Sequence, residues 1–309
     1  MDAIVLFPGQ GSQKPGMGKS IFNSFDVAKR TFEEANDALG EHISQLCFEG
    51  DATELSLTHN AQPAILATSI ACYRVLQEEI DLKPALCAGH SLGEYSALVA
   101  AGVLGFSDAL KLVRLRGQAM QKAVPIGKGG MAAVMGLAGE DVAKLCNEVS
   151  EGQSVAPANF NGGGQVVVSG DMDAVDRVVA NAKKFGAKRA IKLKVSAPFH
   201  SELMAPASDV MKKALTEVSL GEFSCPVISN VEATAYPSTS ETVDLLVRQI
   251  TGAVKWEQSI AAIEKKTTIK NTIECGHGTV LKGLCKRMGS SLTLSSFSDP
   301  ADLDELKKI

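Results

Sequence analysis

Ser91 lies in the segment Gly89-His90-Ser91-Leu92-Gly93, between an apolar run of strand length, Ala85–Ala88, and a segment rich in helix-forming residues, Glu94–Ala101. Glycine at both second neighbours of a serine permits a sharp strand-to-helix turn that holds the serine in strained backbone geometry with its hydroxyl exposed. The first N–H groups of the following helix, beginning with that of Leu92, then face a developing oxyanion. The alternative is a chance match in a loop, but the strand-before, helix-after context favours a nucleophilic serine.

A serine hydroxyl is a weak nucleophile without an adjacent base, and the chain has five histidines. His90 neighbours the serine, but adjacent side chains diverge at such a turn. His42 and His59 lie in polar segments that flank helices and are expected at the surface. His200 and His277 both follow predicted strands, where α/β sheets carry their chemistry. The pattern leaves both open as the base.

Two arginines lie on different faces of a helix predicted over Ala109–Ala123, which is capped by Ser107-Asp108. Arg114 groups with the polar, solvated side. Arg116 belongs to an apolar stripe. A guanidinium on such a stripe needs a carboxylate or phosphate partner because it does not deprotonate. A ligand site is therefore one interpretation, and a structural ion pair or an arginine that reaches to solvent is the other.

Composition predicts a soluble chain without a resident metal or other cofactor. The 309 residues are 45% hydrophobic and carry a net charge of −4, which gives no overall field for nucleic acid. Seven cysteines without a Cys-x-x-Cys motif argue against a disulfide framework, and Cys275, His277 and Cys285 are irregularly spaced for a metal site. No signal peptide is evident, and the longest apolar run, Ala97–Phe106, is about half of a membrane span. We expect a cytoplasmic protein.

Two further segments bear on which ligands and partners the chain can bind. Pro8–Gln13 follows a buried strand, Ala3–Phe7, but Lys14 and Gln13 stand where nucleotide-binding loops need glycine. This loop can instead bring a backbone N–H close to a neighbouring strand end. Residues 181–195 hold six basic and no acidic side chains, which is usual for a solvated face and also suits an acidic partner.

The remaining segments indicate an α/β chain interrupted by a small domain. Helices are predicted at Ile21–Leu39 and Ala61–Glu79. After a linker at Gly127–Gly130, strands and helices alternate as βαββαβ, the split-βαβ pattern, in the order Met131–Leu137, Asp141–Val149, Val155–Phe160, Gln165–Ser169, Asp173–Phe185 and Lys188–Val195. Alternating strands and helices then resume, with helices Glu202–Val218, Thr242–Gln249 and Trp256–Lys265, strands Cys225–Ser229 and Ile269–Glu274, a helix after Gly276-His277-Gly278, and a short helix at Asp302–Ile309.

Taken together, the motifs resemble those of the malonyl-CoA:acyl carrier protein transacylases over nearly the whole chain. The matching features are Gly9–Gln13, Gly89–Glu94, Arg116, Pro198–His200 and Gln249, in the family's order and spacing. The resemblance implies an α/β fold. Its large domain is α/β-hydrolase-like with a parallel sheet, from residues 1–126 and 197–309. Residues 127–196 form an inserted ferredoxin-like subdomain.

The resemblance also implies roles for individual residues. Ser91 would be the nucleophile and His200 the base, oriented largely by a backbone carbonyl. The backbone N–H groups of Gln10 and Leu92 would form the oxyanion hole, and Arg116 would hold the free carboxylate of malonate. The further substrate-binding residues implied are Gln249, Phe199 and Asn159.

Phe199 before the histidine is similar to the malonyl-selecting versions of the fold. His277 departs from the family, which more often has Gly-Pro-Gly in this loop.

The expected reaction is malonyl transfer from malonyl-CoA to the phosphopantetheine thiol of acyl carrier protein, through a malonyl-Ser91 ester, for fatty-acid biosynthesis by a monomer. The carrier protein could dock on a basic strand that contains Lys188, Arg189, Lys192 and Lys194. Four alternatives stay open: a stand-alone polyketide-synthase acyltransferase, a thioesterase, a serine hydrolase with His277 and Asp244, and a non-catalytic carrier-protein-binding domain.

Overall fold

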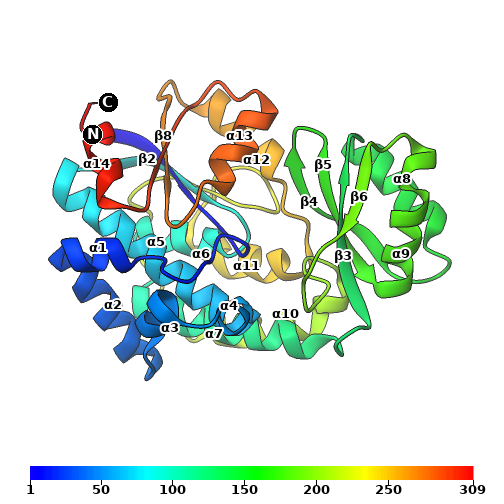
Figure 1. The fold of residues 1–309 in the computed structure, drawn as a ribbon, viewed down its shortest axis with the longest axis horizontal. Coiled ribbons are helices and arrows are strands. Elements are labelled where there is room, and N and C mark those ends of the chain that lie inside the picture. The colour runs from blue at the N-terminus through cyan, green and yellow to red at the C-terminus, as the bar shows by residue number, and fades with distance from the viewer. Residues whose placement is uncertain (309) are drawn as a thin grey trace.

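The computed structural model describes residues 1–308. A five-stranded, fully parallel sheet lies at the centre of its larger part (Figure 1). Its strand order is β7-β2-β1-β8-β9, and the strands are β1 (Asp2–Phe7), β2 (Lys83–Gly89), β7 (Val227–Ile228), β8 (Asn271–Cys275) and β9 (Thr293–Phe297). Side chains of β1 alternate between two hydrophobic clusters, one on each face of the sheet. Both faces are therefore covered, which explains why this strand is apolar from Ala3 to Phe7.

Helices cover the two faces unequally. The larger cluster contains residues of α2 (Asp26–Leu39), α5 (Thr58–Ile80), α6 (Gly93–Ala100), α7 (Phe106–Ala123), α10 (Ala205–Thr216) and α11 (Thr242–Thr251). The opposite face packs against α12 (Trp256–Lys266) and α13 (Val280–Met288), with Trp256 fully buried. None of the helices in residues 1–308 is both long enough and apolar enough to cross a bilayer.

A second, antiparallel sheet stands at one end of the molecule (Figure 1, green). Its order is β4-β5-β3-β6, formed by β3 (Gly129–Met135), β4 (Val155–Gly162), β5 (Gln165–Asp171) and β6 (Arg189–Lys192). Helices α8 (Gly139–Val149) and α9 (Met172–Asn181) cover its outer face and share a hydrophobic cluster of their own with it. This is the split-βαβ arrangement, so the predicted fold class, a parallel sheet with a ferredoxin-like insertion, is confirmed.

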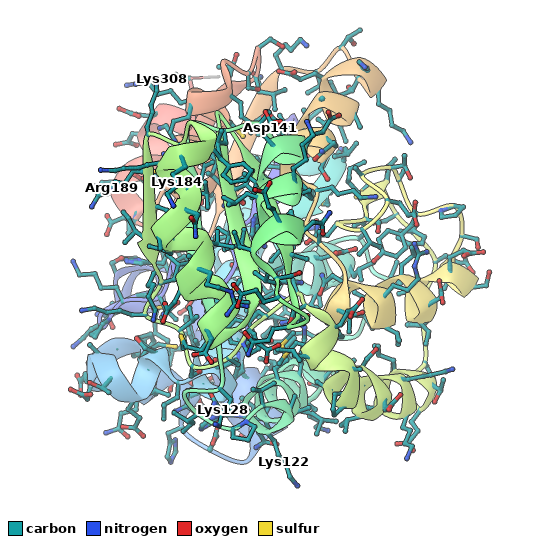
Figure 2. All side chains as sticks on the ribbon, turned by 90° about the vertical axis from the view of Figure 1, so that its right-hand side faces the viewer. Lys122, Lys128, Asp141, Lys184, Arg189 and Lys308 are labelled. Atoms are coloured by element: carbon teal, nitrogen blue, oxygen red, sulfur yellow. The ribbon has the colours of Figure 1, made fainter. Side chains whose placement is uncertain are left out.

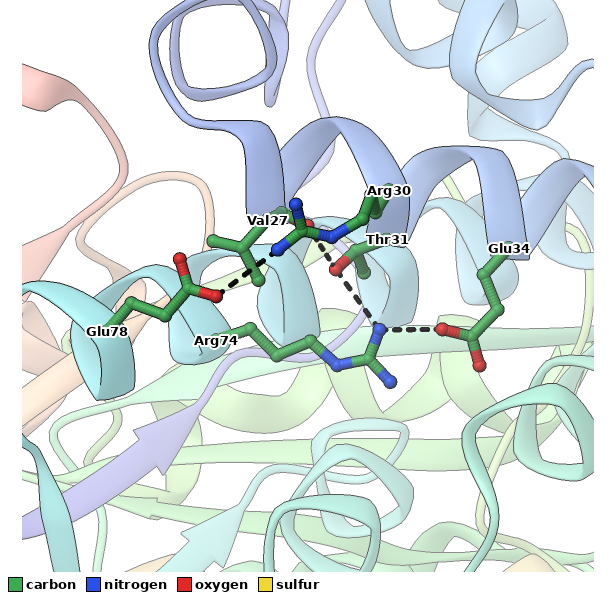
Figure 3. Close-up of polar contacts among 6 residues, drawn as sticks. All are labelled: Val27, Arg30, Thr31, Glu34, Arg74 and Glu78. Carbon is green, nitrogen blue, oxygen red and sulfur yellow. Dashed lines mark hydrogen bonds and ion pairs between the residues drawn. The ribbon is translucent and has the colours of Figure 1, made fainter.

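Salt bridges and hydrogen bonds join α2 to α5 beside the larger cluster (Figure 3). Arg74 of α5 donates to the hydroxyl of Thr31 (3.1 Å) and pairs with Glu34 (2.7 Å), and Arg30 of α2 pairs with Glu78 (3.3 Å). The Arg30–Glu78 pair is exposed, and such pairs contribute little. Arg74 is partly buried and joins both helices, so it contributes more.

The helix predicted over Ile21–Leu39 is two helices. Phe25 adopts extended backbone (φ −133°, ψ 124°) and separates α1 (Lys19–Ser24) from α2. The apolar spacing continues across the break, so periodicity alone could not reveal it. Two short helices, α3 (Ile43–Glu49) and α4 (Ala52–Ser56), were not predicted. Asp51 caps α4 by accepting from two of its backbone N–H groups.

Several other boundaries differ from the prediction. Gly129 and Gly130, predicted as linker, begin β3, whereas the strand predicted to reach Val195 ends at Lys192. Strand β9 was missed. The helix predicted over Glu202–Val218 begins as a 3₁₀ turn at Glu202–Met204 and continues as α10 (Ala205–Thr216). Other 3₁₀ segments lie at Ala182–Phe185, Thr239–Glu241 and Pro300–Asp302. The predicted C-terminal helix is α14 (Leu303–Leu306), and Ile309 lies outside the described residues.

Candidate active site

Ser91 occupies the turn between β2 and α6. Its φ of 51° is left-handed, which is the strained geometry predicted from the two flanking glycines. A Cβ on Gly89 would lie 2.0 Å from the backbone of Gly93, and a Cβ on Gly93 would lie 2.0 Å from the carbonyl oxygen of Phe7. The turn therefore needs glycine at both positions because strand, helix and β1 approach one another too closely for any side chain.

His200 lies against the serine although 109 residues separate them. The Ser91 hydroxyl is 2.8 Å from His200 Nε2, and Nδ1 is 2.9 Å from the carbonyl oxygen of Gln249 and 3.1 Å from that of Gly252. Because carbonyls only accept, Nδ1 carries the proton and Nε2 is left to accept from the serine. Burial, and then the positive charge of Arg116, lowers the pKa of His200 to about 3, so the imidazole is neutral near pH 7.

The segment that carries His200 differs from the prediction. The sequence suggested a strand ending just before this histidine. The strand instead ends at Lys192, and His200 has a left-handed φ of 58°. The two carbonyls at the end of α11, and not a strand end, therefore orient the ring.

None of the other three candidate groups contacts the serine among the described residues. His90 turns away to Asn161 (2.9 Å) and packs against the ring of Trp256. His277 is half-buried and is not part of the cavity wall around Ser91. Asp244 pairs with Arg248 of its own helix on the surface. The structure thus does not assemble the arrangement of a serine with His277 and Asp244.

Arg116 is 2% exposed and forms no ion pair within residues 1–308. Its guanidinium donates to the side-chain oxygens of Gln62 and Gln249 (both 2.8 Å) and to the Ser91 hydroxyl (3.2 Å), while Nε has no hydrogen-bond partner. Burial lowers the pKa of Arg116, but a guanidinium stays charged. A structural ion pair and a solvent-reaching arginine are therefore both excluded, and a buried positive charge faces the serine.

Arg114 was predicted on the solvated side of the same helix, and this is wrong. It is partly buried, pairs with Glu41 and donates to the side-chain oxygen of Asn60. The short helices α3 and α4, which the sequence did not reveal, follow Glu41 and precede Asn60 in the chain.

Gln249 joins the serine turn to the arginine. Its amide nitrogen donates to the carbonyl oxygen of Ser91 (2.9 Å) and to Glu94 (2.7 Å), and its oxygen accepts from Arg116. Asn230 supports the same turn, because its side chain accepts from the Ser91 N–H (2.7 Å) and donates to the carbonyl oxygen of Gly89 (2.7 Å). Sequence reasoning missed Asn230. It follows the short strand β7, and no spacing links it to the serine.

Two backbone N–H groups are available beside the serine. No hydrogen bond within the described residues uses the backbone N–H of Gln10 or of Leu92, and both residues line the cavity at Ser91. The loop of Gln10 lies directly against the turn, since a Cβ on Gly9 would be 2.3 Å from the carbonyl oxygen of His90.

A cavity of about 390 Å³ opens at Ser91 between the two sheets. Phe199 and Asn159 belong to its wall, whereas Gln249 does not. Asn159 comes from β4, so the inserted sheet contributes to the cavity directly. The other residues of the wall are Gln10, Gly11, Gln13, Ser56, Gln62, His90, Leu92, Arg116, Met120, Met131, Leu193, Lys194, Val195 and His200.

The four residues of the basic strand have different surroundings. Lys188 and Arg189 are exposed, and Figure 2 shows Arg189 projecting sideways at the edge of the inserted sheet, where β6 lies. Lys192 pairs with Asp176 (2.6 Å), and Lys194 belongs to the cavity wall. Within residues 1–308 no group of three or more His, Cys, Asp or Glu side chains is arranged to hold a metal ion.

Comparison with known proteins gives a consistent result. Residues 4–291 match the model of the acyl transferase domain family. The chain is 45% identical over 298 residues to the malonyl CoA-acyl carrier protein transacylase of Salmonella typhimurium, covering 96% of each protein.

Solved structures agree with this. An acyl-carrier-protein S-malonyltransferase from Burkholderia pseudomallei superimposes with a TM-score of 0.96 at 45% identity over all of both chains. So does a malonyl-transacylase solved in complex with its type II polyketide-synthase acyl-carrier protein, at 42% identity and a TM-score of 0.96 over all of both chains.

Proposed function

We infer, because this chain belongs to the acyl transferase family and to its malonyl CoA-acyl carrier protein transacylases, that it transfers a malonyl group from malonyl-CoA to the thiol of an acyl carrier protein. The main evidence at this site is the buried Arg116, which has no carboxylate partner within residues 1–308 and lies 3.2 Å from the Ser91 hydroxyl. A malonyl thioester brings a carboxylate and a carbonyl carbon together, and this site offers a receptor for one and an attacking group for the other.

For the first half-reaction we propose Ser91 as nucleophile and His200 as base. The Ser91 oxygen attacks the thioester carbonyl as its proton passes to Nε2 of His200, and the tetrahedral intermediate then expels the CoA sulfur, which takes that proton. The 2.8 Å contact and the neutral imidazole support this assignment. In the second half-reaction the carrier-protein thiol gives its proton to His200 and attacks the ester, which restores the serine.

We propose that the backbone N–H groups of Gln10 and Leu92 stabilise the oxyanion in both steps. Their freedom from other hydrogen bonds and their position in the cavity wall support this. Arg116 would grip the malonyl carboxylate, with Gln249 holding the guanidinium in place from outside the cavity. An acetyl group would leave that guanidinium unpaired, which disfavours it.

Phe199 and Asn159 are proposed to contact the acyl group or the thioester arm from the cavity wall. We propose the division into residues 1–126 with 197–309 and an inserted subdomain of residues 127–196. The separate hydrophobic cluster of the second sheet supports this division. Docking of the carrier protein on the basic strand, a cytoplasmic location and a carrier from fatty-acid rather than polyketide synthesis are further parts of the proposal.

The test is intact mass after mixing with malonyl-CoA. A stable malonyl adduct is expected, absent in Ser91→Ala and much reduced in His200→Ala, whereas His277→Ala behaves as the unmodified protein. Rapid release of free malonate without transfer to a carrier protein would favour a hydrolase instead. Comparing carriers from fatty-acid and polyketide systems as acceptors then identifies the pathway.

A further inference from the structure

A second buried charge lies behind Arg116. Glu94, in the first turn of α6, is completely buried, and within residues 1–308 no cation is close enough to form an ion pair with it. One carboxylate oxygen accepts from the hydroxyl of Tyr236. The other accepts from the amide of Gln249 (2.7 Å) and the backbone N–H of Asn230 (3.2 Å).

The amide of Gln249 connects this carboxylate to the guanidinium. Its nitrogen donates to Glu94 and its oxygen accepts from Arg116 at 2.8 Å. The dipole of the amide is therefore aligned between a negative and a positive charge, which are two hydrogen bonds and one amide group apart, on the order of 8 Å. Burying either charge alone would be costly. When Glu94 is ionised, its charge largely balances that of Arg116.

We propose that Glu94 is a positioning residue that sets how tightly Arg116 holds the substrate's carboxylate, by acting as its counter-charge through Gln249. The proposal rests on the malonyl transfer inferred above. A malonyl carboxylate on Arg116 places a second negative charge on the order of 8–10 Å from Glu94. At an effective dielectric of about 20, repulsion over this distance weakens binding about twentyfold. Glu94 thus keeps the malonyl group from binding too tightly to leave with the carrier protein.

Protonation of Glu94 should make the binding of malonyl-CoA depend on pH. Burial raises the pKa of Glu94 to about 7, while the hydrogen bonds from Tyr236 and Gln249 oppose the rise. The ionisable groups that face Glu94 are Tyr236 from the segment after β7, Arg116 from α7 and Tyr95 on α6 itself. Burial raises the pKa of both tyrosines, that of Tyr95 to about 12, and the guanidinium stays charged. Among these groups, Glu94 alone changes charge between pH 6 and 8.5.

The experiment measures dissociation constants of malonyl-CoA and acetyl-CoA by calorimetry in a Ser91→Ala background, so that no ester forms. At pH 8, Glu94→Gln should bind malonyl-CoA about twentyfold more tightly and acetyl-CoA within twofold of the parent. In the parent, the preference for malonyl-CoA should increase as the pH falls through about 7, and Glu94→Gln should remove this dependence. Acetyl-CoA carries the same nucleotide, so it corrects for titration of the CoA phosphates.

Glu274 provides the matched control. It is also completely buried, and it accepts from the backbone N–H groups of Leu281 and Lys282 away from the cavity. Glu274→Gln should leave the malonyl preference unchanged. If Glu94 only supports the fold, its replacement should weaken the binding of both CoA esters. Weaker malonyl-CoA binding by Glu94→Gln, or equal changes for the two esters, therefore overturns the proposal.

Tyr236→Phe gives an independent test should Glu94→Gln not fold. It keeps the carboxylate but removes a donor that lowers the pKa of Glu94, so the inflection in malonyl preference should move to higher pH. An unmoved inflection counts against the proposal. Absence of malonyl transfer by the unmodified protein would instead defeat the proposed function, so the two failures are distinguishable.

Discussion

The charge of Arg116 should act on His200 as well as on the substrate, and Arg116→Gln tests this. Arg116 lies 3.2 Å from the Ser91 oxygen, which is 2.8 Å from His200 Nε2, so the two nitrogens are no more than about 6 Å apart. Two positive charges at about 6 Å repel by about 3 kcal/mol at an effective dielectric of about 20, which is about two pH units. Removing the guanidinium charge therefore raises the pKa of His200 from about 3 to about 5, because burial, the larger cause of the depression, persists.

The assay is an NMR titration of protein labelled with ¹³C-histidine, with the His200 signal assigned from His200→Ala. In the unmodified protein this signal should stay that of a neutral ring down to pH 4.5, and in Arg116→Gln it should titrate near pH 5. Arg114→Gln is the control, because Arg114 lies on the same helix but pairs with Glu41. A His200 signal that titrates at the same pH with and without Arg116 would refute the electrostatic argument, and titration near pH 6.5 in the unmodified protein would refute burial of the ring.

Three further predictions concern the turn, the helical layer and the basic strand. Gly89→Ala should destabilise the protein by at least about 3 kcal/mol, because its Cβ would meet the backbone of Gly93 at 2.0 Å; an unchanged urea midpoint would contradict this. Arg74→Ala should cost about 1–2 kcal/mol in thermal unfolding through loss of its contacts between helices, and no measurable change would mean that they are solvent-screened. Charge reversal at Arg189 and Lys192 together should raise KM for the carrier protein but not for malonyl-CoA in steady-state assays. If the KM for the carrier protein is the same in the variant and the unmodified protein, the strand is only a solvated surface and does not bind the carrier.

The sequence predicted those helices and strands whose buried residues form a regular pattern within the element itself. β1 is apolar from Ala3 to Phe7 because clusters cover both faces of its sheet, and the inserted βαββαβ order follows from alternation within each of its elements. The features it missed depend on contacts from elsewhere. Strand β9 is short, polar and partly buried at a sheet edge, so only its pairing with β8 defines it. The break at Phe25 leaves the apolar spacing unchanged, so the hydrophobic pattern of the sequence cannot reveal it.

The same distinction applies to the site. The glycines around Ser91 are required by the local turn, so their spacing predicted the turn geometry from five residues. The sequence indicated Arg116 as a candidate ligand-binding residue because a charged side chain is unusual on the apolar stripe of a helix. The residues alone did not choose between His200 and His277, because both follow predicted strands, and only the resemblance or the contacts decide. Asn230 gave no local signal at all.

The supports of the site explain why Arg116 remains available to a substrate. His200 is held by the carbonyl oxygens of Gln249 and Gly252, so no acid is needed to orient it. An aspartate in that position would add a buried negative charge near the guanidinium and would weaken its attraction for the malonyl carboxylate. The buried acid that does balance the charge, Glu94, is kept one amide away by Gln249. Neutral groups therefore orient the base and connect the charges, which leaves the positive charge facing the cavity for the substrate.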